Sequence, residues 1–280
     1  MKNIINSNLS PEEEHSQKCE NVLSIIKSEL VNYLQKNNIN DVVIWVSWGV
    51  DSAVDLSIAS QVVDPEHIHA IYMPTKFNSD KSFELAQTLA GNLWVDLKVW
   101  PIQKVLESFE DYSDKYLWTP LEWVSHENVQ ARIRAVILMA LANNHNALVI
   151  NNSNKTELEL WYGTLYGDLI GWLCLIWDLK KTEVYDLAKH LNREKEIIPQ
   201  WIIDRKASAE LSEWQVDPFD YQRDSDPLDE LAFWGNVEDV AKKYWLDKEY
   251  TQSLKNRIEK SKFKAIQIPP IVKISDHPLK

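Results

Sequence analysis

Apolar positions in the first forty residues recur at helical spacing and predict a helix with one buried face. The stretch "SPEEE" at residues 10–14 is typical of a capped helix start, with a hydroxyl, a proline and acidic residues in the first turn. We expect this helix to pack against the rest of the chain through Val22, Leu23, Ile26, Leu30 and Leu34.

Three continuous apolar runs predict buried strands. They read "DVVIWV" at 41–46, "HIHAIYM" at 67–73 and "NALVI" at 146–150. Such runs suit a parallel sheet that is covered on both faces. Helical patterns lie beside them at about 51–63, 80–92 and 126–144. The alternation predicts an α/β fold with a doubly wound parallel sheet.

Beyond Ile150 the pattern becomes irregular. We expect a loop over 200–228, helical structure over 229–261 and an extended segment in "QIPPIVKISDHP". These are helical C-terminal additions to the sheet. No linker-like stretch interrupts the chain, so residues 1–280 are expected to form a single domain.

Charge and composition narrow the class of protein. The net charge of −12 argues against nucleic acid and against anionic membranes as partners, because both require a basic face. No apolar stretch is long enough to span a membrane, and nothing resembles a signal peptide. Cys19 and Cys174 have no metal-binding or disulfide-framework spacing. We therefore expect a cytoplasmic protein.

The loop "SWGVDS" at 47–52 carries the first sign of chemistry. It follows a predicted strand and opens a predicted helix, where backbone N–H groups, hydroxyls and the helix dipole favour an anion. Asp51 is suited to a divalent cation that bridges phosphates. From the residues alone, a simple helix cap is the alternative.

With glycine at position 48, this loop resembles the S-G-G-x-D-S signature of the ATP pyrophosphatases, whose fold is called adenine nucleotide alpha-hydrolase-like. Residues 127–192, 205–221 ("RKASAELSEWQVDPFDY") and 256–270 ("NRIEKSKFKAIQIPP") then resemble one member family, NAD synthetase, almost throughout. The resemblance covers about residues 20–274 and leaves residues 1–19 as an N-terminal extension. In order along one chain, these segments are far more specific than the loop alone.

The resemblance implies a reaction and its cofactors. NAD synthetases use ATP and Mg²⁺ to adenylate the nicotinate carboxylate of deamido-NAD, releasing pyrophosphate, and ammonia then displaces AMP. A carboxylate needs such a leaving group before it reacts with ammonia, and the site must neutralise charge on the departing pyrophosphate.

Matching positions imply the site residues. Asp51 and Glu157 correspond to metal ligands, and Arg132 and Lys264 correspond to deamido-NAD contacts. Contacts to ATP are implied for Ser47, Gly49, Val50, Asp51, Ser52, Met73, Asn152, Lys181 and Ser208. Without the family, Arg132 and Lys181 would be read as solvated charges and Glu157 as a first-turn carboxylate. No role is assigned to any histidine.

We expect the ammonia-dependent type, because no glutaminase region precedes the synthetase region; a separate amidotransferase could supply ammonia. A homodimer is implied by the resemblance only. Asn151, Asn152, Glu127 and Ala207 depart from the family pattern, and Leu165 stands where some relatives have a substrate-binding lysine. Another ATP-pyrophosphatase ligase is therefore a further alternative, and so is a catalytically dead nucleotide-binding paralogue if Trp48 is genuine.

Glycine is scarce and tryptophan abundant: six Gly against 13 Trp, where glycine ordinarily makes up roughly 7% of residues. Tryptophan occurs where relatives have glycine at 45, 48, 161, 177 and 214, and we expect the same at 94, 172, 201 and 245. We interpret this as a decoding artefact, because some bacterial genetic codes read UGA as glycine and others read it as tryptophan. A gene that uses the first code but is translated with the second would show tryptophan at these positions. UGG codons at positions 45, 48, 161 and 177 of the gene would contradict that interpretation.

Overall fold

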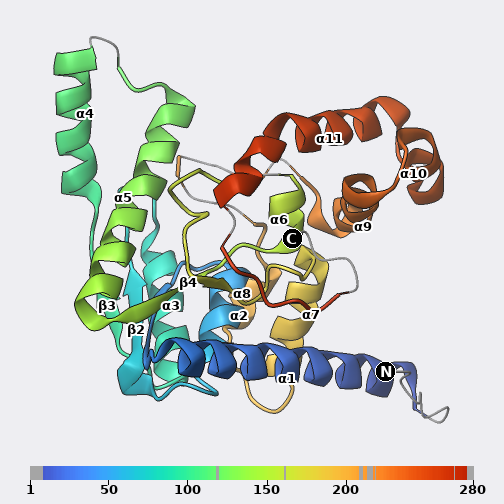
Figure 1. Ribbon diagram of the computed structural model, residues 1–280, viewed down its shortest axis with the longest axis horizontal. Coiled ribbons are helices and arrows are strands. Elements are labelled where there is room, and N and C mark those ends of the chain that lie inside the picture. The colour runs from blue at the N-terminus through green and yellow to red at the C-terminus, as the bar shows by residue number, and fades with distance from the viewer. Residues whose placement is uncertain are drawn as a thin grey trace.

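A five-stranded parallel sheet forms the centre of the molecule (Figure 1). The computed structural model describes residues 9–117, 120–160, 162–207, 211–212, 217, 219–267 and 269–275. The strand order is β3-β2-β1-β4-β5, with all neighbours parallel. The strands are β1 Asp41–Trp45, β2 Ile68–Tyr72, β3 Leu97–Val99, β4 Ala147–Asn151 and β5 Leu173–Cys174. The predicted α/β fold with a parallel sheet is confirmed.

Alternation along β1 divides the core into two layers. Val42 and Ile44 face the larger cluster, which also contains buried residues of α1, α2, α3 and α7. Val43 faces the other side, where Ile137 and Leu138 of α5 cover the sheet. Successive side chains of a strand point to opposite faces, so one short apolar run contributes to both layers.

The first helices lie close to their predicted positions. They are α1 Pro11–Asn37, α2 Val50–Ala59, η1 Pro65–His67, α3 Asp80–Asn92, α4 Gln103–Leu117 and α5 Trp123–His145. Ser10 caps α1 as expected, and it also forms a capping box with Glu13. Helix α2 ends at Ala59, four residues before its predicted end.

The second half of the chain is more helical than predicted. It contains α6 Lys155–Glu159, α7 Lys181–Leu191, α8 Gln200–Asp204, α9 Tyr221–Phe233, α10 Val237–Tyr244, α11 Lys248–Ser261 and η2 Lys262–Gln267. The prediction of a loop over 200–228 is wrong at both ends, where α8 and the start of α9 lie. Pro227 lies inside α9, which is held by the buried residues Tyr221, Leu228 and Leu231. Packing therefore outweighs the hydrogen bond that proline cannot donate.

The C-terminal helices α9, α10 and α11 form a group beside the sheet (Figure 1). They share an apolar cluster with Leu160 at the end of α6. The chain then returns to the sheet, and Ile271 bridges Cys174 in parallel. Asp178 accepts hydrogen bonds from the backbone N–H groups of Ile274 (2.7 Å) and Ser275 (2.5 Å). The expected extended segment is thus attached to the edge of the sheet.

No helix in the described part of the chain is both long enough and apolar enough to cross a membrane.

Two exposed tryptophans adopt a backbone conformation that favours glycine. Trp94 follows α3 with φ 60° and is 86% exposed, and Trp245 ends α10 with φ 58° and is 94% exposed. The left-handed region costs a residue with a Cβ roughly 1 kcal/mol or more, and glycine is the usual residue at such helix ends. Neither indole is buried enough to offset that cost.

We predict that Trp94→Gly and Trp245→Gly each raise the free energy of unfolding by about 1 kcal/mol, since glycine adopts positive φ without strain. Urea denaturation measures the change. The matched control is Trp123→Gly, because Trp123 is 84% exposed but is the first residue of α5. Glycine should bring no gain there. A loss of stability at both left-handed positions would refute the prediction.

Candidate active site

A cavity of about 460 Å³ lies at the carboxyl edge of the sheet. Residues that follow β1, β2 and β4 line it, together with the start of α7 and the inner side of α5. In parallel sheets this edge is the usual ligand crevice, because loops from several strands and the starts of their helices converge there. The volume falls in the range of small-molecule sites.

The loop between β1 and α2 has the features of an anion-binding turn. Gly49 is the N-cap of α2, so the N–H groups at the start of this ten-residue helix are directed toward the cavity. Ser47 Oγ lies 2.9 Å from Ser52 Oγ and accepts a hydrogen bond from Gly49 N at 3.1 Å. Val50 also lines the cavity. The structure therefore brings the predicted loop residues together.

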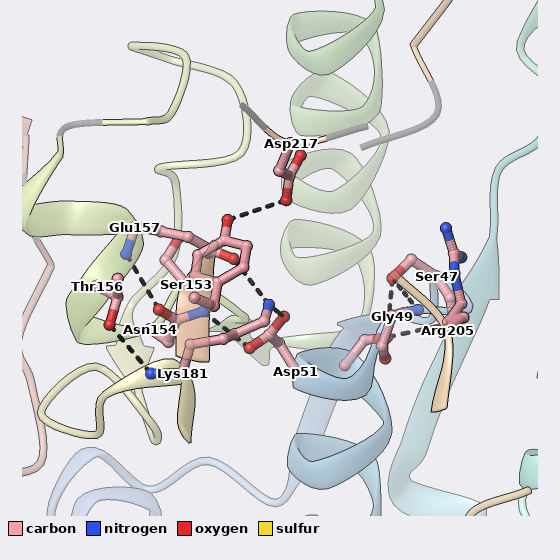
Figure 2. A network of polar contacts seen from close by, with 12 residues as sticks. Ser47, Gly49, Asp51, Ser153, Asn154, Thr156, Glu157, Lys181, Arg205 and Asp217 are labelled. Atoms are coloured by element: carbon pink, nitrogen blue, oxygen red, sulfur yellow. Dashed lines mark hydrogen bonds and ion pairs between the residues drawn. The ribbon is translucent and has the colours of Figure 1, made fainter. Parts of the chain in front are cut away.

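Asp51, Glu157 and Lys181 meet although they come from three separate helices (Figure 2). The Lys181 ammonium donates to Asp51 Oδ2 and, at 3.0 Å, to Glu157 Oε1. Its side chain is only 3% exposed. Asn154, the N-cap of α6, donates to Asp51 Oδ1 at 2.9 Å and accepts from the backbone N–H of Glu157 at 3.1 Å. The contacts that were predicted separately thus form one network.

Burial dominates the electrostatics of this network. It raises the pKa of Glu157 to about 7, against the opposing attraction of Lys181. Burial alone would lower the pKa of Lys181, but the carboxylates of Asp51 and Glu157 outweigh it and raise that pKa. Buried charges of this kind are stable only when they are paired.

Asp217 is a further carboxylate that lines the cavity, and no role was predicted for it. Burial raises its pKa, and the Tyr221 hydroxyl donates to its Oδ2 at 2.9 Å. Asp217 lies within "RKASAELSEWQVDPFDY", a segment that resembles NAD synthetase, and this resemblance was the sequence signal that could have identified it. Its side chain stands close to the Glu157 and Lys181 pair (Figure 2).

Asp51 and Glu157 fit Mg²⁺ as part of a coordination shell. Both provide oxygen ligands, and a cationic group already lies between them. In the described residues no group of three or more His, Cys, Asp or Glu side chains is arranged to hold a metal by itself. Mg²⁺ commonly takes one or two carboxylates and completes its shell with phosphate and water.

The two arginines of "ARIR" lie on different sides of α5. Arg132 is exposed, donates to the carbonyl of Leu165 at 3.1 Å and does not line the cavity. Arg134 is 3% exposed, lines the cavity and donates through Nε to the carbonyl of Met73 at 3.2 Å. Residues two apart on a helix point in nearly opposite directions. Sequence reasoning thus missed Arg134, whereas the role of Arg132 stays a prediction.

The other predicted contacts are placed as follows. Met73, Asn152 and Lys264 all line the cavity. Asn152 donates to the carbonyl of Trp45 at 2.7 Å, and Lys264 donates to the carbonyl of Gly163 at 2.6 Å. Ser208 lies outside the described residues. Leu165 packs against the cluster that contains Trp177 and does not line the cavity.

Trp48 belongs to the loop "SWGVDS" at 47–52, the predicted phosphate loop, and lies at the edge of the cavity. Its indole is 8% exposed, lines the cavity and stacks on Trp201 with ring centres 5.5 Å apart. The Arg205 guanidinium carbon lies 2.9 Å from the centre of the Trp48 ring. We therefore expect the indole to obstruct a phosphate that approaches the backbone of this loop, whereas glycine would leave the approach open.

Taken together, these features define a nucleotide-binding α/β protein whose site is suited to phosphate groups. The NAD synthase family model matches residues 22–268, and the chain belongs to this family.

Individual proteins and solved structures that the chain resembles are also synthetases of this kind or close to it in name. The chain is 30% identical to the NH(3)-dependent NAD(+) synthetase of Chlorobaculum tepidum, over 91% of the chain and 89% of that protein. A structure of NH3-dependent NAD synthetase from Campylobacter jejuni, in complex with nitrate, has a TM-score of 0.69 and 28% identity, with 94% and 98% of the two chains covered. An NMN synthetase structure from Francisella tularensis has a TM-score of 0.69 and 27% identity, covering 98% and 100%. The chain spans only 36% to 44% of several glutamine-dependent NAD(+) synthetases that it also matches.

We predict that Trp48→Gly raises the affinity for Mg-ATP by at least about tenfold, which corresponds to 1.4 kcal/mol of relieved steric conflict. Calorimetric titration of the variant and of the chain as written measures the change. Trp94→Gly, which lies outside the cavity lining, serves as the control and should leave the affinity unchanged. Equal Mg-ATP affinity with and without the indole would show that Trp48 does not obstruct the site.

Proposed function

We propose that this protein is an ammonia-dependent NAD synthetase, which amidates deamido-NAD at the expense of ATP. The contact of Asp51, Glu157 and Lys181 beside the phosphate loop carries the proposal. Family membership supports it, as do the relatives named NH(3)-dependent NAD(+) synthetase. The proposed alternative to free ammonia is ammonia supplied by a separate amidotransferase.

The first step is adenylation. An oxygen of the nicotinate carboxylate attacks the α-phosphorus of ATP, and the bond to the β-phosphate oxygen breaks, so that pyrophosphate leaves. The N–H groups at the start of α2 and the hydroxyls of Ser47 and Ser52 would hold the phosphates through hydrogen bonds, joined by Asn152 and Ser208. Lys181 would neutralise charge on the departing pyrophosphate. Backbone groups at Met73 would contact the adenine.

The second step forms the amide. Ammonia attacks the carbonyl carbon of the adenylate, AMP leaves, and a proton is released as the amide forms. Arg132 and Lys264 would hold the dinucleotide in place. Asp51 and Glu157 would hold Mg²⁺, which supplies a positive charge that stabilises the pyrophosphate as it leaves.

The assay uses a variant in which glycine replaces tryptophan at positions 45, 48, 94, 161, 172, 177, 201, 214 and 245. This variant is called the glycine-restored protein. Incubated with deamido-NAD, Mg-ATP and ammonium, it should form NAD, AMP and pyrophosphate. Formation of ADP would contradict cleavage between the α- and β-phosphates. Nicotinate mononucleotide belongs in the substrate panel because one structural relative is an NMN synthetase. Amidation of nicotinate mononucleotide but not of deamido-NAD would show that the protein is instead the alternative ATP-pyrophosphatase ligase.

A nucleotide-binding protein without catalysis is the second candidate. The buried stack of Trp48 on Trp201 favours it for the chain as written, because this stack lies at the phosphate loop. Turnover by the unmodified chain would exclude this candidate.

A homodimer is also proposed. Helix α4 exposes an apolar face made of Val105, Phe109, Tyr112 and Tyr116, and Trp123 and Val124 at the start of α5 are exposed as well. Clustered exposed apolar residues are typical of interaction surfaces. A monomer in sedimentation velocity at micromolar concentration would contradict this proposal. The cytoplasm remains the proposed location.

We predict that Asp51→Asn and Glu157→Gln, in the glycine-restored protein, each lower kcat by a factor on the order of 10² or more. Deamido-NAD affinity should stay within about threefold, because charge on the pyrophosphate grows only in the transition state. Steady-state kinetics and dinucleotide titration measure the two quantities.

The matched control is Glu159→Gln on the same helix. Burial, followed by the neighbouring Asp229, raises the pKa of Glu159 well above its usual range, and Glu159 does not line the cavity, so this variant tests the loss of a carboxyl group from α6 outside the site. Unchanged kcat with weakened dinucleotide affinity in the Asp51 and Glu157 variants would mean that these carboxylates do not serve the metal.

A further inference from the structure

Lys181 occupies the position between the two carboxylates that the proposed function assigns to a metal (Figure 2). Its ammonium is bound to both Asp51 and Glu157 and is almost completely buried. The backbone N–H of Lys181 donates to Thr156 Oγ1 at 3.1 Å, which fixes the start of α7 against α6. The ring centre of Tyr221 lies 5.1 Å from the ammonium nitrogen. The lysine is therefore the counter-ion of this site.

A metal cannot simply be added to this arrangement. Mg²⁺ binds oxygen at about 2.0–2.1 Å. The ammonium holds Asp51 Oδ2 and Glu157 Oε1, and Asn154 holds Asp51 Oδ1, so a metal shared by these two carboxylates would lie close to the ammonium. Two cations so close together in a desolvated site repel each other strongly. Removing the lysine without a replacement would leave two carboxylates buried without compensation. Lysine and metal are thus alternatives at the same pair of carboxylates.

We propose that Lys181 holds this site in the absence of nucleotide and that metal enters only together with ATP phosphates. The phosphates offer the ammonium a new anionic partner, and the four-carbon stem of lysine lets it move to them while its backbone stays fixed. The carboxylates then become available to the metal. Lys181 is a positioning residue for the metal ligands and makes metal binding depend on nucleotide. This inference rests on the proposed assignment of Asp51 and Glu157 as metal ligands.

The adjacent lysine provides a matched control. Lys180 precedes Lys181 and carries the same charge, but its ammonium binds Asp226 at 2.5 Å. Lys180 does not line the cavity. Replacing either lysine by methionine removes one positive charge from the start of α7, so a general electrostatic effect on metal affinity would be similar in both variants.

The experiment measures binding of Mn²⁺ to the chain without nucleotide, by electron paramagnetic resonance and by the shift in thermal midpoint. The unmodified chain and Lys180→Met should show only weak binding. Lys181→Met should bind Mn²⁺ at least about tenfold more tightly, a difference of 1.4 kcal/mol, and Mn²⁺ should raise its midpoint. Adding Glu157→Gln to Lys181→Met should abolish the gain, which would place the ion at these carboxylates.

Equal Mn²⁺ affinity in the unmodified chain and in Lys181→Met would overturn the inference, and so would an equal gain in Lys180→Met. If Lys181→Met does not fold, Lys181→Gln replaces it, because an amide can still donate to one carboxylate without carrying charge. If the glycine-restored protein forms AMP but Lys181→Met gains no Mn²⁺ affinity, the proposed function stands and this inference alone is refuted. If Lys181→Met gains Mn²⁺ affinity but the glycine-restored protein forms no AMP, the proposed function is refuted and the coupling of Lys181 to metal binding stands.

Discussion

The buried ammonium of Lys181 is the contact on which the arrangement of the site depends. A charge that is 3% exposed requires compensation, and it obtains this from carboxylates on α2 and α6. Helices α2, α6 and α7 follow β1, β4 and β5, so this one contact draws together three helix starts at the same edge of the sheet. The N-cap Asn154 adds a neutral link between α2 and α6.

The predicted phosphate loop imposes a second constraint, which is steric. Backbone N–H groups can bind a phosphate only if nothing stands between them, and glycine is the residue that allows such an approach. Trp48 lines the cavity at this loop, while Trp94 and Trp245 adopt left-handed backbone in solvent. These positions conflict with tryptophan for two unrelated physical reasons, yet glycine would resolve all of them. That agreement supports the decoding interpretation, although the codons themselves decide it.

The C-terminal part of the chain completes the cavity from the side opposite α5. The helices α9 to α11 pack on the end of α6, and Arg257 and Lys264 from this region line the cavity. The last described residues return to β5, where Asp178 holds the backbone of Ile274 and Ser275. Residues that are distant in sequence therefore enclose the site together.

The sequence alone determined the elements whose signal is local. Apolar runs located β1, β2 and β4 within a residue or two, helical spacing located α1 and α3, and the resemblance located the phosphate loop, Asp51, Glu157 and Lys181. The tertiary structure decided what depends on distant partners. Strands β3 and β5 have only three and two residues, too few for a pattern, and exist because a neighbouring strand pairs with them. Pro227 made the first part of α9 resemble a loop in the sequence, but packing stabilises the helix there. Arg134 rather than Arg132 lines the cavity because the packing of α5 on the sheet decides which side of the helix is buried. The cluster around Lys181 forms only when three strands lie side by side.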